Sequence, residues 1–101
     1  MKDYQEYLIE SLKDPEEAEA YLNASIEAYM EDNNMQALML ALEHLARARY
    51  SMTDLAKKVG VQRQHLYRIF DNESNPKFQT VTELINSLGF TLEVKRKPQI
   101  A

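Results

Sequence analysis

Residues 52–71, with the sequence MTDLAKKVGVQRQHLYRIFD, decide the fold of this chain. Leu55 and Ala56 close the inner face of a first short helix, and the small Ala56 leaves room for a second helix to cross nearby. Gly60 stands where the chain must turn sharply, and a left-handed backbone conformation costs little only for glycine. The pattern predicts a helix-turn-helix, a unit whose second helix is shaped to enter the major groove of DNA.

The second helix of this unit has two different sides. We expect Val61, Leu66 and Ile69 to bury its inner side. The outer side then carries Arg63, Gln64, Tyr67 and Arg68. Because arginine and glutamine form paired hydrogen bonds with the edges of guanine and adenine, this side predicts a surface that reads bases. His65 in the same helix is either a DNA or phosphate contact or a plain surface residue. The competing interpretation of the whole unit is an ordinary pair of surface helices with a polar face.

Length and composition restrict the class of protein. We expect residues 1–101 to form a single helix-turn-helix DNA-binding domain, too small to hold a sensor domain as well. No stretch approaches the roughly 20 apolar residues of a membrane span, and the first ten residues lack the basic start and apolar run of a secretory signal. The chain has no cysteine, which excludes disulfides and thiolate chemistry. These features predict a cytoplasmic protein without membrane contact.

The net charge of −4 hides a division between the two halves of the chain. Residues 1–44 carry eleven acidic side chains against two basic ones, for a net charge of −9. Residues 45–101 carry ten basic side chains against five acidic ones, for a net charge of +5. The basic half holds the predicted helix-turn-helix and suits a polyanion, whereas the acidic half suits a basic partner. A solvated helix face that needs no partner explains the acidic half equally well.

Further helices are predicted on both sides of the unit. Asp14 and Pro15 mark a helix start, because aspartate caps the first turn and proline suits it, and this helix ends at the polar residues 31–34. Residues 35–49 form a second long helix, which is apolar over so much of its circumference that it is central to the core. A short opening helix or turn is expected over residues 4–12, and a last helix over 78–88 follows a polar loop at 72–76. We place Met30, Leu40 and Phe78 on the apolar faces of these helices.

The carboxyl-terminal residues change to a period of two. Leu92 and Val94 share one side of a predicted short strand at 91–95, and a basic tail continues to residue 101. Since a single strand cannot satisfy its own backbone groups, it must pair with an amino-terminal segment, a twin subunit or another protein, unless it is a frayed tail. The expected fold is all-α: an acidic helical extension over 1–34, a helix-turn-helix core over 35–90 with five or six helices in all, and the short strand.

Nothing in the sequence favours catalysis. His44 and His65 are the only histidines, and they lack the spacing of metal ligands. Two glycines cannot build a loop that cradles phosphate, and no cysteine is present as a nucleophile. We expect a protein that is not an enzyme and that uses no cofactor and no metal.

Three stretches of the chain resemble one known family, in that family's own order. They are LKDPEEAEAYLNA at 12–24, LARAR at 45–49, and NPKFQTV at 75–81 running on to LGF at 88–90. With residues 52–71 they span most of the chain, which resembles the small HigA-like addiction-module antidote proteins, antitoxins of bacterial chromosomes and prophages with a helix-turn-helix of the Cro/C1 type. Gln62 stands where this family commonly has Ser or Thr, and Tyr50 where it often has Gly.

The resemblance implies a bacterial antitoxin that neutralises a RelE- or HigB-like mRNA-cleaving toxin and represses its own operon. It places the residues that contact the double-stranded operator DNA as follows: Arg63, Gln64 and Arg68 on bases, Gln62 and Tyr67 beside them, and Asn75 and Lys77 on phosphates. Because one unit contacts few phosphates, we expect a homodimer that reads two half-sites. Two other functions stay open. One is a stand-alone prophage-type repressor with no toxin, and the other is a protein-interaction module that has lost DNA binding.

Overall fold

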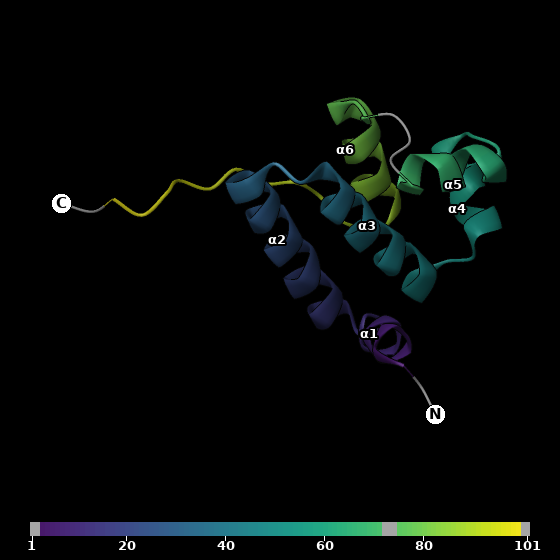
Figure 1. The fold of residues 1–101 in the computed structure, drawn as a ribbon, viewed down its shortest axis with the longest axis horizontal. Helices are drawn as coiled ribbons and strands as arrows, with labels where there is room; N and C mark the ends of the chain where they lie inside the picture. Colours follow the sequence, from purple (N-terminus) through teal and green to yellow (C-terminus); the bar gives the residue numbers. More distant parts are fainter. Residues whose placement is uncertain (1–2, 72–74, 100–101) are drawn as a thin grey trace.

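Six α-helices build the part of the chain that the computed structural model describes, residues 3–71 and 75–99 (Figure 1). Their bounds are α1 Tyr4–Ser11, α2 Pro15–Asp32, α3 Met35–Arg49, α4 Met52–Val59, α5 Arg63–Asp71 and α6 Phe78–Ser87. The expectation of an all-α chain with five or six helices is confirmed over these residues. The predicted polar loop at 72–76 falls largely on residues 72–74, which lie outside the described residues.

Local signals in the sequence fix several helix ends. In α1 to α4 the residue before the helix accepts a hydrogen bond from a backbone N–H of the first turn; these caps are Asp3, Asp14, Asn34 and Ser51. Such a cap typically stabilises a helix by about 1 kcal/mol. At the other end of α4, Gly60 has a φ of +84°, the left-handed conformation for which glycine is suited. The predicted start at Asp14 and the predicted turn at Gly60 are both confirmed.

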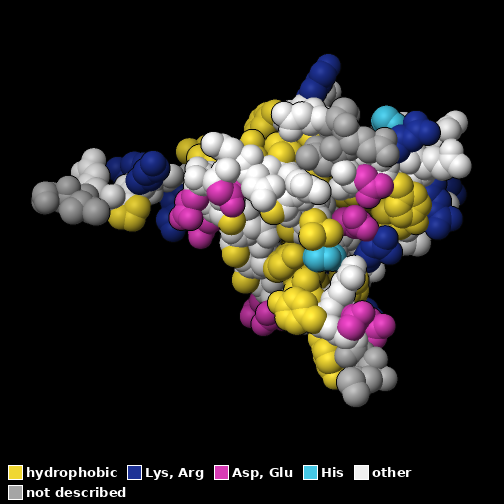
Figure 2. Space-filling view, in the orientation of Figure 1, with side chains coloured by type: hydrophobic (Ala, Val, Ile, Leu, Met, Phe, Trp, Pro, Cys, Tyr) yellow, Lys and Arg dark blue, Asp and Glu magenta, His cyan; other side chains and the backbone are white. Residues whose placement is uncertain are grey.

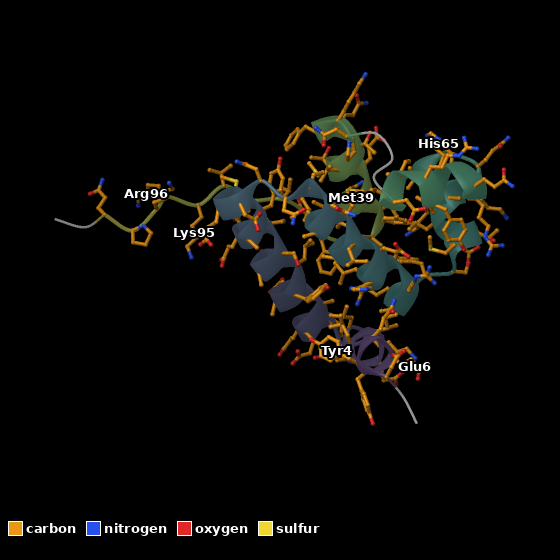
Figure 3. All side chains as sticks on the ribbon, viewed as in Figure 1. Tyr4, Glu6, Met39, His65, Lys95 and Arg96 are labelled. Atoms are coloured by element: carbon orange, nitrogen blue, oxygen red, sulfur yellow. The ribbon has the colours of Figure 1, made fainter. Side chains whose placement is uncertain are left out.

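Helix α3 is the centre of the core. It packs against α1, α2, α4 and α5, and seven of its fifteen residues are buried. Leu42, Leu45 and Ala46 are fully buried there, and Leu12 and Leu22 join them from the amino-terminal side. Figure 3 shows Met39 among the packed side chains of this region. The predicted central place of this helix is confirmed.

Three apolar side chains that we placed on inner faces lie outside instead. Met30 of α2 is 73% exposed, Leu40 of α3 is 49% exposed and Phe78 of α6 is 75% exposed. The long helix α2 packs chiefly on α3, so the neighbouring helix covers only part of its apolar stripe. Phe78 is the first residue of α6, one turn before the buried Val81. These predictions were wrong because sequence spacing gives the width of an apolar stripe but not the width of the surface that covers it.

The predicted strand at 91–95 is also wrong for the isolated chain. Residues 91–99, called the tail below, run extended and exposed away from the helices (Figure 1). Val94 is 99% exposed, and none of the tail residues donates or accepts a backbone hydrogen bond with the rest of the described chain. A strand needs a neighbour for its backbone groups. The amino-terminal segment was one candidate neighbour, but it forms the helix α1 and so cannot pair as a strand.

Candidate functional site

Helices α4 and α5 position the residues predicted to read bases. The two helices pack against each other, and α5 also packs on α3. Leu55 of α4 and Leu66 of α5 are fully buried, and Phe70, which the sequence prediction did not include, is buried as well. Val61 and Ile69, expected on the inner side, are half-buried. This packing fixes the rotation of α5 about its axis, so its opposite side faces solvent.

The exposed side of α5 carries most of the predicted site residues around one shallow hollow. The hollow has a volume of about 410 Å³ and is lined by Val61, Gln62, Gln64, His65 and Arg68. The lining positions of the helix recur at three- and four-residue steps, which places their side chains on one face. Figure 3 shows His65 on the outer edge of α5, away from the core. The structure therefore brings Gln62, Gln64, His65 and Arg68 together.

Arg63 and Tyr67 form a second row beside this hollow. The Nη2 of Arg63 donates a hydrogen bond of 3.2 Å to the hydroxyl oxygen of Tyr67, one helical turn further on. The guanidinium carbon of Arg63 lies 5.6 Å from the centroid of the Tyr67 ring, within reach of a cation–π interaction. Two contacts to one neighbour restrict the rotamers of a long side chain. Arg63 is thus held in place before any ligand arrives, which lowers the entropy cost of binding.

Asn75 and Lys77 stand apart from this surface. Both are exposed and lie just before α6, a helix that packs on α4. Lys58 joins α4 to the end of α6. Its Nζ lies 4.5 Å from the Tyr50 ring centroid and 3.5 Å from the carbonyl oxygen of Ser87, the last residue of α6. The structure places Asn75 and Lys77 on a separate element and does not bring them into the hollow of α5.

A polar pair that the sequence pattern did not predict lies inside the α2–α3 interface. A hydrogen bond of 3.0 Å joins the hydroxyl of Tyr21 to Nδ1 of His44. Burial lowers the pKa of His44, with Glu43 raising it and Arg47 lowering it, and burial together with nearby Tyr4 raises the pKa of Tyr21. Each side chain thereby provides a hydrogen-bond partner for a polar group that burial would otherwise leave without one. Among the described residues, no three or more His, Cys, Asp or Glu side chains gather closely enough to hold a metal ion.

Helix α2 presents an acidic side to solvent. Its exposed acids include Glu16, Glu19, Glu27 and Glu31. At about 100° of rotation per residue, these four positions share about a third of the helix circumference, away from the buried Ala18 and Leu22. In Figure 2, acidic side chains lie at both ends of α2, and basic side chains lie around α4 and α5. The acids of α2 and the basic residues around α4 and α5 therefore lie on different helices, while the basic residues of the tail lie beside the acidic end of α2.

Comparison with known proteins identifies the family. Residues 3–96 match the model of a family described as probable addiction module antidote protein. The chain belongs to this antidote family. It is also 30% identical over 96 residues to an uncharacterized protein of Haemophilus influenzae (strain ATCC 51907 / DSM 11121 / KW20 / Rd), a match that covers 95% of this chain and 92% of that protein. No solved structure matches the chain.

Membership of the antidote family indicates an antitoxin of a toxin–antitoxin system, with a toxin partner of some kind. The predicted likeness to antitoxins is confirmed at this level. The narrower HigA-like and Cro/C1 assignment is not part of the match and stays a prediction. No helix in the described part of the chain is long and apolar enough to cross a membrane.

Proposed function

We propose that this chain is a HigA-like antitoxin with a Cro/C1-type helix-turn-helix. It binds and neutralises a RelE- or HigB-like toxin and, as a homodimer, represses its own operon by sequence-specific binding to DNA. The observation that carries the proposal is the antidote-family match over residues 3–96, found in a chain whose α5 exposes an arginine- and glutamine-bearing side. The protein works by binding alone in the cytoplasm, without enzymatic activity or a cofactor.

Operator recognition uses the exposed side of α5. Gln64 and Arg68 extend from the hollow to base edges in the major groove, and Arg63 reaches a further base from the row beside it. Lys77 and Asn75, on the segment before α6, contact phosphates and set the position of the protein on the duplex. The exposed imidazole of His65 lies on the same side of α5 and contacts the DNA backbone.

Toxin capture uses the acidic side of α2. RelE-type toxins are basic as a family, and the first 44 residues of this chain carry a net charge of −9. The four acids on one side of α2 concentrate that charge where a basic protein meets it. Complementary charge acts mainly on the association rate, because it steers the partners before contact. The antitoxin thus presents different surfaces to its two partners.

The test separates the two surfaces by charge reversal. Glu19, Glu27 and Glu31 are changed together to Lys, and association rates are measured with the toxin encoded beside this gene and with operator DNA, at low and high salt. Glu16 is left intact because it lies in the first turn of α2, where an acid stabilises the positive end of the helix dipole. We expect slower toxin capture at low salt and undiminished operator binding.

Two further variants serve as controls. Changing the same three glutamates to Gln removes the charge without reversing it and should give an intermediate rate. Changing Arg63 and Arg68 together to Ala should weaken operator binding and leave toxin capture unchanged. Normal toxin capture by the Lys variant at low salt would refute the proposal that the acidic side of α2 binds the toxin. A chain that binds its operator but captures no toxin would be a stand-alone repressor, and one whose weak DNA affinity hardly changes with salt would be an interaction module.

A further inference from the structure

The tail is an extended segment with defined limits at both ends. At its start, the backbone N–H of Phe90 donates to the carbonyl oxygen of Ile85 at 3.1 Å and so belongs to the folded helices. At its end, Pro98 has no N–H and cannot donate to a strand ladder. The free stretch between them is residues 91–97, and its middle residue is Val94. An exposed edge with free backbone groups on both sides is a template for pairing with another chain.

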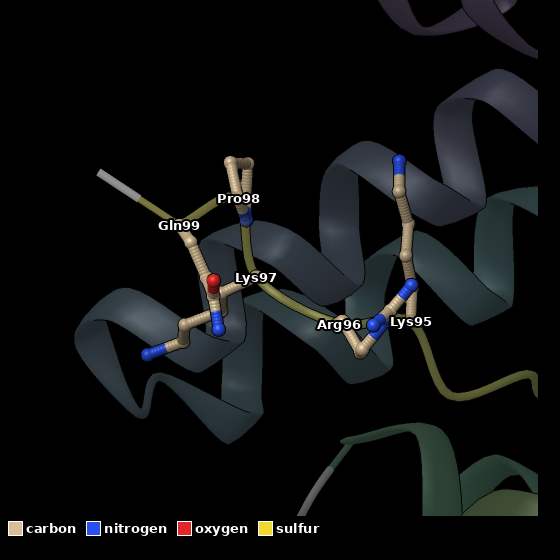
Figure 4. Close-up of a pocket in the computed structure, with 5 residues that line it drawn as sticks. All are labelled: Lys95, Arg96, Lys97, Pro98 and Gln99. Carbon is tan, nitrogen blue, oxygen red and sulfur yellow. The ribbon is translucent and has the colours of Figure 1, made fainter. Parts of the chain in front are cut away.

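The side chains of this stretch distinguish between possible partners. Lys95, Arg96 and Lys97 make its end basic, and Glu93 is its one acid, so a strand that pairs with it should offer a base opposite Glu93 and an acid opposite Lys95. A hollow of about 770 Å³ at the tail is lined by Lys95–Gln99 alone, which Figure 4 shows along one extended segment, so it offers no walled site for a small ligand. A second copy of the same tail, by contrast, supplies both an acid and a base at matching positions.

We propose that two copies of this chain pair their tails as antiparallel strands about a two-fold axis at Val94. In this register Val94 lies opposite Val94 of the second copy, and Glu93 of each copy lies opposite Lys95 of the other. The two opposite-charge pairs are therefore directly cross-strand neighbours. The register shifted to an axis at Glu93 would instead place two carboxylates opposite each other. The charge pairs between Glu93 and Lys95 and the limits of the free stretch at residues 91 and 97 therefore both place the two-fold axis at Val94.

This pairing also accounts for the exposed apolar side chains of the tail. Leu92 and Val94 of both copies come to one face of the ribbon, where the aliphatic stem of Arg96 opposite Leu92 covers part of it. Figures 1 and 4 show the tail passing the end of the molecule where α2 meets α3, and Met30 near the end of α2 is 73% exposed. A two-stranded ribbon alone is marginally stable, so its role is to add affinity and fix the register of the dimer.

A cysteine scan of this cysteine-free chain tests the register. Val94→Cys places the two thiols directly opposite each other, at a Cα separation of about 4.5–5.5 Å that a disulfide spans. In Glu93→Cys and Leu92→Cys the two thiols are offset along the strands by about 7 Å and 13 Å, too far for a relaxed bridge. Under mild oxidation of the full-length chain we expect Val94→Cys to form the covalent dimer roughly ten times faster than either control. Equal rates at the three positions, or a maximum at residue 93, would overturn the register.

Charge reversal provides the second arm. Glu93→Lys and Lys95→Glu each turn both cross-strand pairs repulsive, and each should weaken self-association roughly tenfold or more in sedimentation equilibrium. An equimolar mixture of the two single variants forms a heterodimer with every pair attractive and should regain the wild-type association. The double variant should regain it too. Self-association that is unchanged in both single variants would overturn the pairing, as would a loss that the mixture fails to restore.

This inference rests on the homodimer of the proposed function, but the two fail differently. Figure 1 shows the tail on the other side of the molecule from α5, so tail variants should retain the base preference of each half-site. A chain that dimerises equally well after truncation at Phe90 overturns the tail pairing and leaves the repressor function standing. A full-length chain that stays monomeric on its operator overturns the proposed dimer and the tail pairing with it.

Discussion

Replacement of Arg63 by Ala is the sharpest test of the proposal that α5 contacts DNA. A good arginine–base pair contributes about 1–3 kcal/mol of discrimination at one base pair. A dimer loses this contact in both half-sites, so the binding free energy should weaken by about 2–6 kcal/mol, a factor of roughly 30 to 20,000 in Kd. The effect should be concentrated at one base-pair position, repeated by symmetry in the other half-site.

The structure predicts that the fold will tolerate this change. Arg63 lies on the exposed side of α5, and its contacts within the chain are the hydrogen bond and ring contact with Tyr67, both at the surface. Substitution of such a surface residue usually changes stability by no more than about 0.5 kcal/mol. Tyr67→Phe keeps the ring and removes the hydroxyl oxygen that accepts from Arg63. It should therefore weaken operator binding in the same direction as Arg63→Ala, but by less.

Fluorescence anisotropy with the operator duplex and a set of its single-base-pair variants measures both affinity and preference. Arg47→Ala is the matched control, because it removes the same charge from α3, where Arg47 pairs with Glu43 at 2.8 Å, away from the α5 surface. The control should reduce affinity modestly and equally for all sequences. If Arg63→Ala left both the affinity and the base preference at wild-type values, the placement of α5 in the major groove would be refuted.

Four further predictions follow from the contacts described. Lys77→Ala should weaken binding to all DNA sequences about equally and lower the salt dependence by about one phosphate per half-site, measured by salt titration. Leu66→Ala should reduce the free energy of unfolding by about 2–5 kcal/mol in urea denaturation, because this fully buried side chain joins α5 to the core. Burial holds the pKa of His44 below its ordinary value, so the folded chain keeps His44 neutral while the unfolded chain takes up a proton. Thermal stability should therefore fall as the pH drops below about 6.5, and the fall should be smaller in His44→Gln. Gln62→Ser should raise the stability of the free protein by about 0.5–1 kcal/mol in thermal unfolding, because serine is a good helix cap and glutamine a poor one.

The sequence predicted those parts of the fold that depend on local chemistry. Asp14 caps α2 and Gly60 ends α4, and each acts through its own backbone within a few residues. Where burial depends on what another helix covers, spacing was not enough. Met30 and Phe78 have the right period for the core and are exposed, whereas Phe70 is buried by the packing of α5 on the rest of the chain.

The candidate site shows the same limit. The sequence pattern predicted the exposed side of α5 once it had predicted the buried side, because burial of Leu66 fixes the rotation of the helix about its axis. The contact of Arg63 with Tyr67 and the hollow beside it depend on rotamers, which a helical pattern does not specify. The Tyr21–His44 hydrogen bond joins residues 23 positions apart, and no local signal announces such a pair. The period of two in the tail predicted a strand that the single chain does not form, because a strand needs a neighbour for its backbone groups and no described segment pairs with the tail.

The amino-terminal ends of α5 and α6 are less well capped than those of α1 to α4. Lys77 makes no side-chain cap for α6, and Gln62 before α5 is a poor capping residue, whereas α1 to α4 each have a capping oxygen. Helix amides without a cap exchange their hydrogens readily with water, and phosphate oxygens are suited to accept from them. On operator DNA the first-turn amides of α5 and α6 should become protected from exchange, while those of α1 to α4 keep their rates. The duplex would then supply the hydrogen-bond acceptors that these two helices lack, and the protein would be most completely folded when bound.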